Sequence, residues 1–149
     1  MYPDSNSNSS SSYAANQQAA LQSQEREEMC SNLAKELPSY STDYVKRVMQ
    51  ILGTCQKSME SPRYLMGSIH ADASSQLDNL KLDFPQQRTS VANKELERIV
   101  NKIGVLDGLG EPNDYPSGRF GYLDAAKPVT AYIVDSTKAM RDVLLNQRQ

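Results

Sequence analysis

The sequence predicts an all-α protein, an antiparallel bundle of about four to five amphipathic helices. Apolar residues recur at intervals of three or four along several segments, which is the period of a helix face. No window of five or more residues alternates apolar and polar residues between turn signals, as strands would require. The 149 residues, 38% of them hydrophobic, suffice for one domain with a modest core and exclude a second domain of ordinary size.

Residues 1–14 are predicted to form a disordered leader, followed by a helical domain over residues 15–149. The leader contains only Ser and Asn between Ser5 and Ser12, so it buries too little apolar area to offset the entropy of ordering. The first helix is expected from about residue 15 to Leu37, where Pro38 stops it. Its N-terminal half is polar on all sides and therefore needs a partner or frays.

Three further helices have recognisable starts and ends. Ser41 or Thr42 is the expected N-cap of the second helix, which ends before Pro62. The third runs to about Leu82, and Ser90 caps the fourth. Their apolar stripes are Val45, Val48, Met49, Leu52, Cys55 and Met59; Leu65, Met66, Ile69, Ala73, Leu77 and Leu80; and Val91, Leu96, Ile99, Val100, Ile103 and Leu106.

Residues 107–121 form the longest predicted loop, because four Gly and two Pro in this segment disfavour a regular helix or a central strand. A last helix then begins at Pro128, or begins near Tyr122 and kinks at Pro128; a break or kink at this proline is favoured. The stripe of this helix is Val129, Ile133, Ser136, Met140, Val143 and Leu144.

Composition excludes several functional classes. Sixteen basic against eighteen acidic residues give a net charge of -2, which argues against direct nucleic-acid binding. Neither a secretory signal nor an apolar stretch of bilayer length is present, so we expect a nuclear or cytoplasmic protein that does not bind a membrane and is not secreted by a conventional signal. Two cysteines, Cys30 and Cys55, lie on apolar stripes and are expected to pack in the core.

No residue is predicted to be catalytic, to bind a cofactor or to ligate a metal. His70 is the single histidine and has no second ligand at metal-binding spacing. A catalytic thiolate needs a neighbouring base, and the chain contains neither a Glu-x-x-His motif nor a phosphate-binding glycine motif. We therefore expect no cofactor and no small-molecule substrate.

The glycine-rich loop carries aromatic and apolar residues in a chain that is poor in aromatics. These side chains pack back onto the bundle, which is the favoured interpretation, or form a hot spot for another protein, with Arg119 beside Phe120 as its polar anchor. The last helix adds stripe residues that could bury inside the chain or against a partner. The interface candidates are Tyr115, Arg119, Phe120, Tyr122, Leu123, Ile133, Met140 and Leu144.

The segment Pro116-Ser-Gly-Arg-Phe-Gly-Tyr-Leu-Asp-Ala-Ala126 resembles a pattern, Pro-x-Gly-x-x-x-Tyr-Leu-acidic, of small helical subunits of the Mediator transcription coactivator. Those subunits are also similar in combining leaders rich in Ser, Asn or Gln with long amphipathic helices that assemble with other chains. The resemblance implies a nuclear, non-enzymatic scaffold.

Together these features predict a scaffold or adaptor subunit whose partners are other helical proteins in a multi-protein complex. Its mechanism is the burial of apolar helix stripes against partner helices, as in a coiled coil. Two alternatives stay open: a small helical ligand-binding or enzymatic bundle with a pocket closed by the 107–121 loop, and a self-assembling coat or filament protein.

Overall fold

The protein is a bundle of α-helices, as predicted. The computed structural model describes the backbone of residues 3–146 and the side chains of residues 13–146, and within this range it contains no strand. Short 3₁₀ turns precede α2, α3, α4 and α5. The helices are α1 (Pro3–Glu36), α2 (Thr42–Glu60), α3 (Met66–Asp83), α4 (Val91–Gly108) and α5 (Arg119–Asn146).

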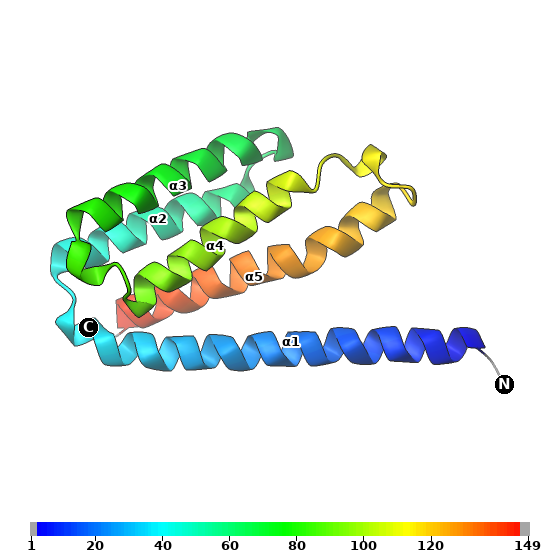
Figure 1. The fold of residues 1–149 in the computed structure, drawn as a ribbon, viewed down its shortest axis with the longest axis horizontal. Helices are drawn as coiled ribbons and strands as arrows, with labels where there is room; N and C mark the ends of the chain where they lie inside the picture. The colour runs from blue at the N-terminus through cyan, green and yellow to red at the C-terminus, as the bar shows by residue number, and fades with distance from the viewer. Residues whose placement is uncertain (1–2, 147–149) are drawn as a thin grey trace.

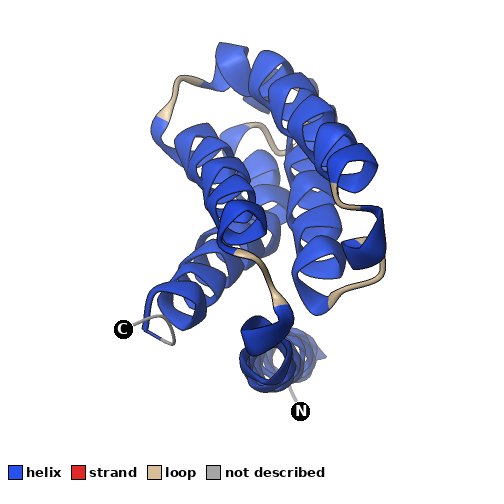
Figure 2. Cartoon of the chain, turned by 90° about the vertical axis from the view of Figure 1, so that its left-hand side faces the viewer, coloured by secondary structure: helices blue, strands red, loops and turns tan. Residues whose placement is uncertain are grey.

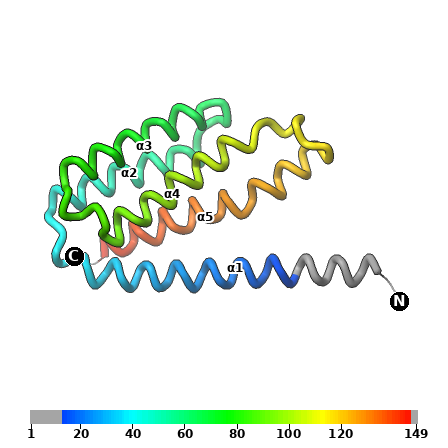
Figure 3. Tube along the Cα trace, in the orientation of Figure 1, coloured from blue at the N-terminus to red at the C-terminus, as the bar shows by residue number. Residues whose placement is uncertain are grey.

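Helices α2 to α5 form a closed four-helix bundle in which each runs antiparallel to the one before it (Figure 1). The circle closes because α5 packs against α2 as well as against α4. Helix α1 lies outside this bundle, along α5 and α4, and the view down the bundle shows it apart from the other four (Figure 2). The trace in Figure 3 shows that α1 and α5 run in the same direction.

The predicted stripes supply the core. In α2, α3 and α4 most stripe residues are buried; Met49, Met59 and Val91 are partly buried, and Leu65 is 37% exposed because it lies in the turn before α3. From α1, Met29, Leu33 and Leu37 reach the same core. The side chains with no exposed surface include Leu33, Tyr44, Val48, Leu52, Cys55, Leu80, Leu96, Ile99, Ile103, Ile133 and Met140.

Helix α1 begins at Pro3, whereas the sequence predicts a start near residue 15. Extending an existing helix by one residue costs much less than starting a new one, so polar sequence can continue a helix that is anchored further along. Its anchor is the buried segment around Met29 and Leu33, and residues 13–21 are exposed. Met1, Tyr2 and the side chains before Tyr13 lie outside the described residues, so the disorder of the leader stays a prediction.

The helix does not break at Pro128, because α5 continues as one helix from Arg119 through this proline; its start is closer to the alternative of a helix that begins near Tyr122. The loop is correspondingly shorter than 107–121, since α4 extends to Gly108. A proline inside a helix leaves the carbonyl four residues earlier without its usual donor. Here that carbonyl belongs to Asp124, and both Asp124 and Pro128 are exposed, so water can satisfy it.

Both predicted serine N-caps are confirmed. The Ser41 hydroxyl accepts a hydrogen bond from the Tyr44 amide at 3.1 Å, and the Ser90 hydroxyl accepts one from the Asn93 amide at the same distance. An N-cap side chain pairs one of the amides that a helix start leaves without a partner.

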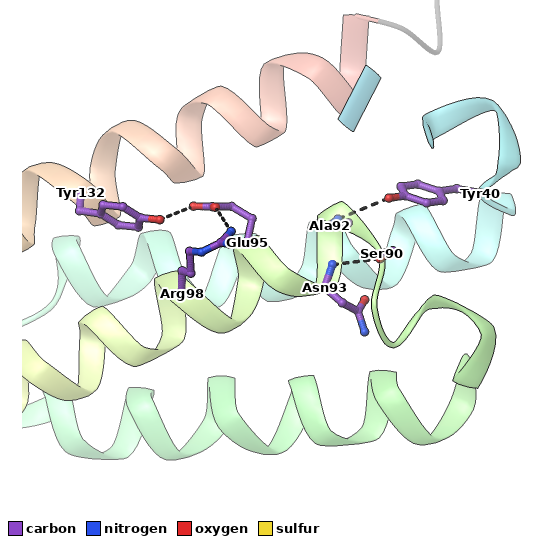
Figure 4. A network of polar contacts seen from close by, with 7 residues as sticks. All are labelled: Tyr40, Ser90, Ala92, Asn93, Glu95, Arg98 and Tyr132. Carbon is purple, nitrogen blue, oxygen red and sulfur yellow. Dashed lines mark hydrogen bonds and ion pairs between the residues drawn. The ribbon is translucent and has the colours of Figure 1, made fainter. Parts of the chain in front are cut away.

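Two further amides at the start of α4 are paired by residues from the end of α1 and the turn after it. A Glu36 carboxylate oxygen accepts from the Val91 amide at 2.9 Å and from the Tyr40 hydroxyl at 2.7 Å. The Tyr40 hydroxyl in turn accepts from the Ala92 amide at 3.4 Å, as Figure 4 shows. A carboxylate at this position also complements the helix dipole.

Tyr44 on α2 completes this α4 capping cluster, which we define as Glu36, Tyr40, Tyr44, Ser90 and Asn93. The Tyr44 side chain has no exposed surface. Its hydroxyl donates to the Asn93 side-chain oxygen and lies 2.9 Å from the Ser90 hydroxyl oxygen. The ring makes edge contacts with Tyr40 at 4.9 Å and, beyond the cluster, with Phe84 at 5.3 Å between centroids. The cluster therefore ties α1, α2 and α4 together.

Removing the Tyr44 hydroxyl tests the cluster. Tyr44→Phe keeps the ring but leaves the buried Asn93 side-chain oxygen without its donor, so we expect the free energy of unfolding to fall by about 1–3 kcal/mol. The matched control is Tyr64→Phe, at a residue 82% exposed, which should stay within about 0.5 kcal/mol of wild type. Urea unfolding followed by circular dichroism measures both, and equal stabilities would contradict the assignment.

Alkaline pH tests the burial of Cys55. Burial raises the pKa of this thiol from 9.0 to about 12, so the folded state keeps a proton that the unfolded chain releases above pH 9. The stabilisation is complete below pH 9 and is lost as pH rises toward 12, with a slope of about 1.4 kcal/mol per pH unit for this one group.

Tyr44, whose pKa burial raises to about 12, adds to the loss above pH 10. The variant Cys55→Ala removes only the thiol contribution, so its free energy of unfolding should fall less steeply than that of wild type between pH 9 and 12. Urea titrations across this range measure the difference, and parallel curves would show that the thiol is not buried as described.

Candidate functional site

Three of the predicted interface residues belong to the core of the chain itself. Ile133 and Met140 have no exposed surface and Leu144 is 1% exposed, so all three pack in the core of this chain. The prediction that these three residues form an interface with a partner is therefore wrong. Helical spacing shows that a stripe is buried, but it does not distinguish burial in the same chain from burial against another one.

Part of the loop packs on the protein, as the sequence favours. The Tyr115 hydroxyl donates to the Leu109 carbonyl at 2.9 Å, and the rings of Tyr115 and Tyr122 meet edge to face at 5.8 Å. Both tyrosines are half-buried. These two candidates therefore hold the loop in shape rather than facing a partner.

The remaining candidates near the loop are exposed, and they fit the alternative interpretation of a hot spot for another protein. Phe120 is 77% exposed and Leu123 is 49% exposed, one turn apart at the start of α5. Arg119 beside them is exposed and has no ion-pair partner among residues 13–146. A large aromatic residue on the surface with an adjacent arginine has the composition of an interface hot spot.

Arg63, in the turn before α3, holds the loop in place. Its Nε donates to the Gly110 carbonyl at 3.1 Å, and its Nη2 donates to the same oxygen and to the Asp107 carbonyl. The guanidinium carbon lies 5.2 Å from the centroid of the Tyr122 ring, a cation–π contact. Gly110 has a φ of 79°, which an L side chain rarely adopts.

We call these contacts of Arg63 the Arg63 clamp. No sequence signal indicates it, because Arg63 and Gly110 lie far apart in the chain and neither belongs to a motif. The clamp joins two connections at the same end of the bundle, the α2–α3 turn and the α4–α5 loop (Figure 1). The α2–α3 turn adds Tyr64, 82% exposed, and Leu65. We call Tyr64, Leu65, Arg119, Phe120 and Leu123 the end surface.

A polar groove of about 390 Å³ lies between α1, α4 and α5. Glu95, 3% exposed, lines it and accepts hydrogen bonds from Arg98 at 3.0 Å and from the Tyr132 hydroxyl at 2.8 Å (Figure 4). Burial, and then the Glu95 charge, raise the pKa of Tyr132. Both carboxylate oxygens are thus engaged, and the network ties α4 to α5.

The groups that could carry chemistry are dispersed. No cluster of three or more His, Cys, Asp or Glu side chains that could hold a metal ion occurs in the described part of the chain. Cys55 is fully buried, as predicted, and Cys30 is half-buried against the core. His70 packs over Gly104, where an added Cβ would lie 2.8 Å from the imidazole Nε2.

Comparison with known proteins adds no assignment: neither a protein family, nor a curated protein, nor a solved structure matches this chain. Among residues 3–146, no helix has the length and apolar character needed to span a bilayer. The resemblance of residues 116–126 to Mediator subunits stays a prediction.

Removing the clamp tests whether Arg63 orders the loop. In Arg63→Ala the amides of residues 109–118 should exchange with solvent at least about tenfold faster, because the three lost hydrogen bonds together contribute about 2–3 kcal/mol. Arg88→Ala, at an exposed arginine without these contacts, should leave the loop unchanged. Hydrogen exchange followed by mass spectrometry measures both, and equal loop protection in the two variants would refute the clamp.

Proposed function

We propose that this protein is a non-enzymatic helical scaffold or adaptor subunit of a larger assembly and that its partners are other helical proteins. The observation that carries the proposal is the exposure of Phe120, at 77%, at the start of α5, directly after a loop that Arg63 and Tyr115 hold in place. Single exposed apolar residues are common on protein surfaces, but Phe120 stands on ordered backbone with the exposed Leu123 one turn away and Arg119 beside it. Such a group suits a binding partner, because a preorganised anchor loses little entropy on association.

The composition of the end surface supports a protein partner. Phe120 and Tyr64 are aromatic, Leu65 and Leu123 are aliphatic, and Arg119 supplies one charge. Aromatic and arginine residues are enriched at the centres of protein interfaces, whereas phosphate or nucleic-acid sites collect several cations.

The nature of the assembly follows from the resemblance of Pro116–Ala126. Because this segment contains Arg119, Phe120 and Leu123, the resemblance falls on the end surface itself. We therefore propose a transcription coactivator of the Mediator type, and with it a nuclear location, as the specific form of this function.

Capture from the native cells tests the proposal. The tagged full chain should co-purify in fixed stoichiometry with other helical proteins, and Phe120→Ala should reduce the recovered partner at least about tenfold, equivalent to about 1.4 kcal/mol of binding. The matched control is Leu82→Ala, at a residue that is also 77% exposed but lies near the C-terminal end of α3. This control should bind as wild type does.

Three results would contradict the scaffold function. The first is equal recovery of partner with Phe120→Ala and wild type. The second is turnover of a small molecule by the isolated chain, which would favour the enzymatic bundle. The third is regular assembly of the purified chain alone, which would favour a coat or filament protein.

A further inference from the structure

The seam between α2 and α5 contains two apolar hollows, one after the other. The first, about 380 Å³, is lined by Met59, Ile133 and Val134 among others, and the second, about 420 Å³, by residues that include Met49 and Leu145. Because α2 and α5 run antiparallel, the end of α2 faces the middle of α5, and the start of α2 faces the end of α5. The two hollows therefore follow one line along the bundle.

Gly53 lies between the hollows, on the same face of α2 as Met49 and Gln56. A Cβ added at Gly53 would meet no atom within 4 Å. Glycine inside a helix is less favourable than alanine by about 1 kcal/mol, and here no neighbouring atom requires it. The missing side chain lowers the ridge between the two hollows, so that a helix can approach the seam along its length.

Two residues that line the first hollow each have a buried polar atom without a hydrogen-bond partner among the described residues. Thr137 is 4% exposed, and its hydroxyl oxygen is buried without a partner among the described residues. The Nε of Arg141 is also buried without a partner among the described residues, and both residues line the hollow. Buried donors of this kind normally find an acceptor, and a carboxylate is the acceptor that an arginine binds most strongly.

The charges along the seam point to an acidic occupant. Lys46, Lys138 and Arg141 line the two hollows, and none of them forms an ion pair within residues 13–146. The acidic residue among the lining side chains, Glu60, already accepts a hydrogen bond from Gln56 at 3.1 Å. A second copy of this chain, docked by the same face, would set these cations against each other.

We propose that the α2–α5 seam binds an amphipathic helix of another protein, with an apolar stripe flanked by Asp or Glu. The apolar stripe fills the hollows on either side of Gly53, and the carboxylates pair with Lys46, Lys138 and the Arg141 guanidinium. This site is separate from the end surface and does not depend on it, so the protein has a second docking face.

The probe is a displayed library of helical peptides of about 18 residues, about 27 Å long, with fixed leucines along one face and randomised flanking positions. Selection uses the full chain. Enriched peptides are then synthesised and their dissociation constants measured by fluorescence anisotropy. We expect enrichment of Asp and Glu at the flanking positions. The dissociation constant of the enriched peptides should rise at least about tenfold with Gly53→Trp and with Lys138→Glu.

Matched variants control for folding and for general charge. Gly53→Ala adds only a Cβ in open space, Lys127→Glu reverses an exposed lysine elsewhere on α5, and Phe120→Ala alters the end surface; all three should bind the peptides as wild type does. If Gly53→Trp unfolds the protein, the comparison of Lys138→Glu with Lys127→Glu decides.

The proposal is overturned by a library that yields no enriched peptide, or one enriched in basic or uncharged flanks. It is also overturned if binding is unchanged in Lys138→Glu or is lost with Phe120→Ala. A third result would also overturn it: if sedimentation shows that the purified wild-type chain is a dimer and that Gly53→Trp abolishes the dimer, the seam binds a second copy of this chain.

Discussion

The pairing of the first amides of α4 is the constraint on which the arrangement of the other helices depends. Val91, Ala92 and Asn93 find acceptors on Glu36, Tyr40 and Ser90, so two of the three come from the end of α1 and the turn after it. Tyr44 connects α2 to the same helix start, because its hydroxyl is hydrogen-bonded to the side chains of Ser90 and Asn93. A buried helix start without such partners would be costly, and α1 therefore lies where its last turn meets α4.

This anchoring explains why one bundle can present two different faces. With α1 fixed over α4 and α5, the polar network of Glu95, Arg98 and Tyr132 lies beneath α1, and the α2–α5 seam faces outward, away from it. Arg63 binds the Asp107 carbonyl at the far end of α4 and the Gly110 carbonyl just after it, so the loop is held at that end of α4. An end surface of aromatic character and a basic apolar seam on the same bundle fit the proposed adaptor function.

Local signals in the sequence predicted the helices and most of the core. Ser41 and Ser90 were recognisable as caps because an N-cap acts within three residues, and the stripes gave the buried faces. The sequence could not show that Glu36 pairs with Val91 or that Arg63 clamps Gly110, because those partners lie dozens of residues apart. A break at Pro128 was predicted wrongly, because solvent exposure, which the sequence does not show, decides whether a helix tolerates a proline. The interface candidates split for a related reason: periodicity predicted burial for Ile133, Met140 and Leu144 but not against which chain.

Native-state hydrogen exchange at the start of α4 measures the central constraint most directly. If the α4 capping cluster holds the bundle together, the amides of Val91, Ala92 and Asn93 exchange only through global unfolding, with an opening free energy and a denaturant dependence equal to those of the whole protein. If these three amides instead exchange through a local opening that is insensitive to denaturant while the core stays protected, the cluster is peripheral and the account is contradicted.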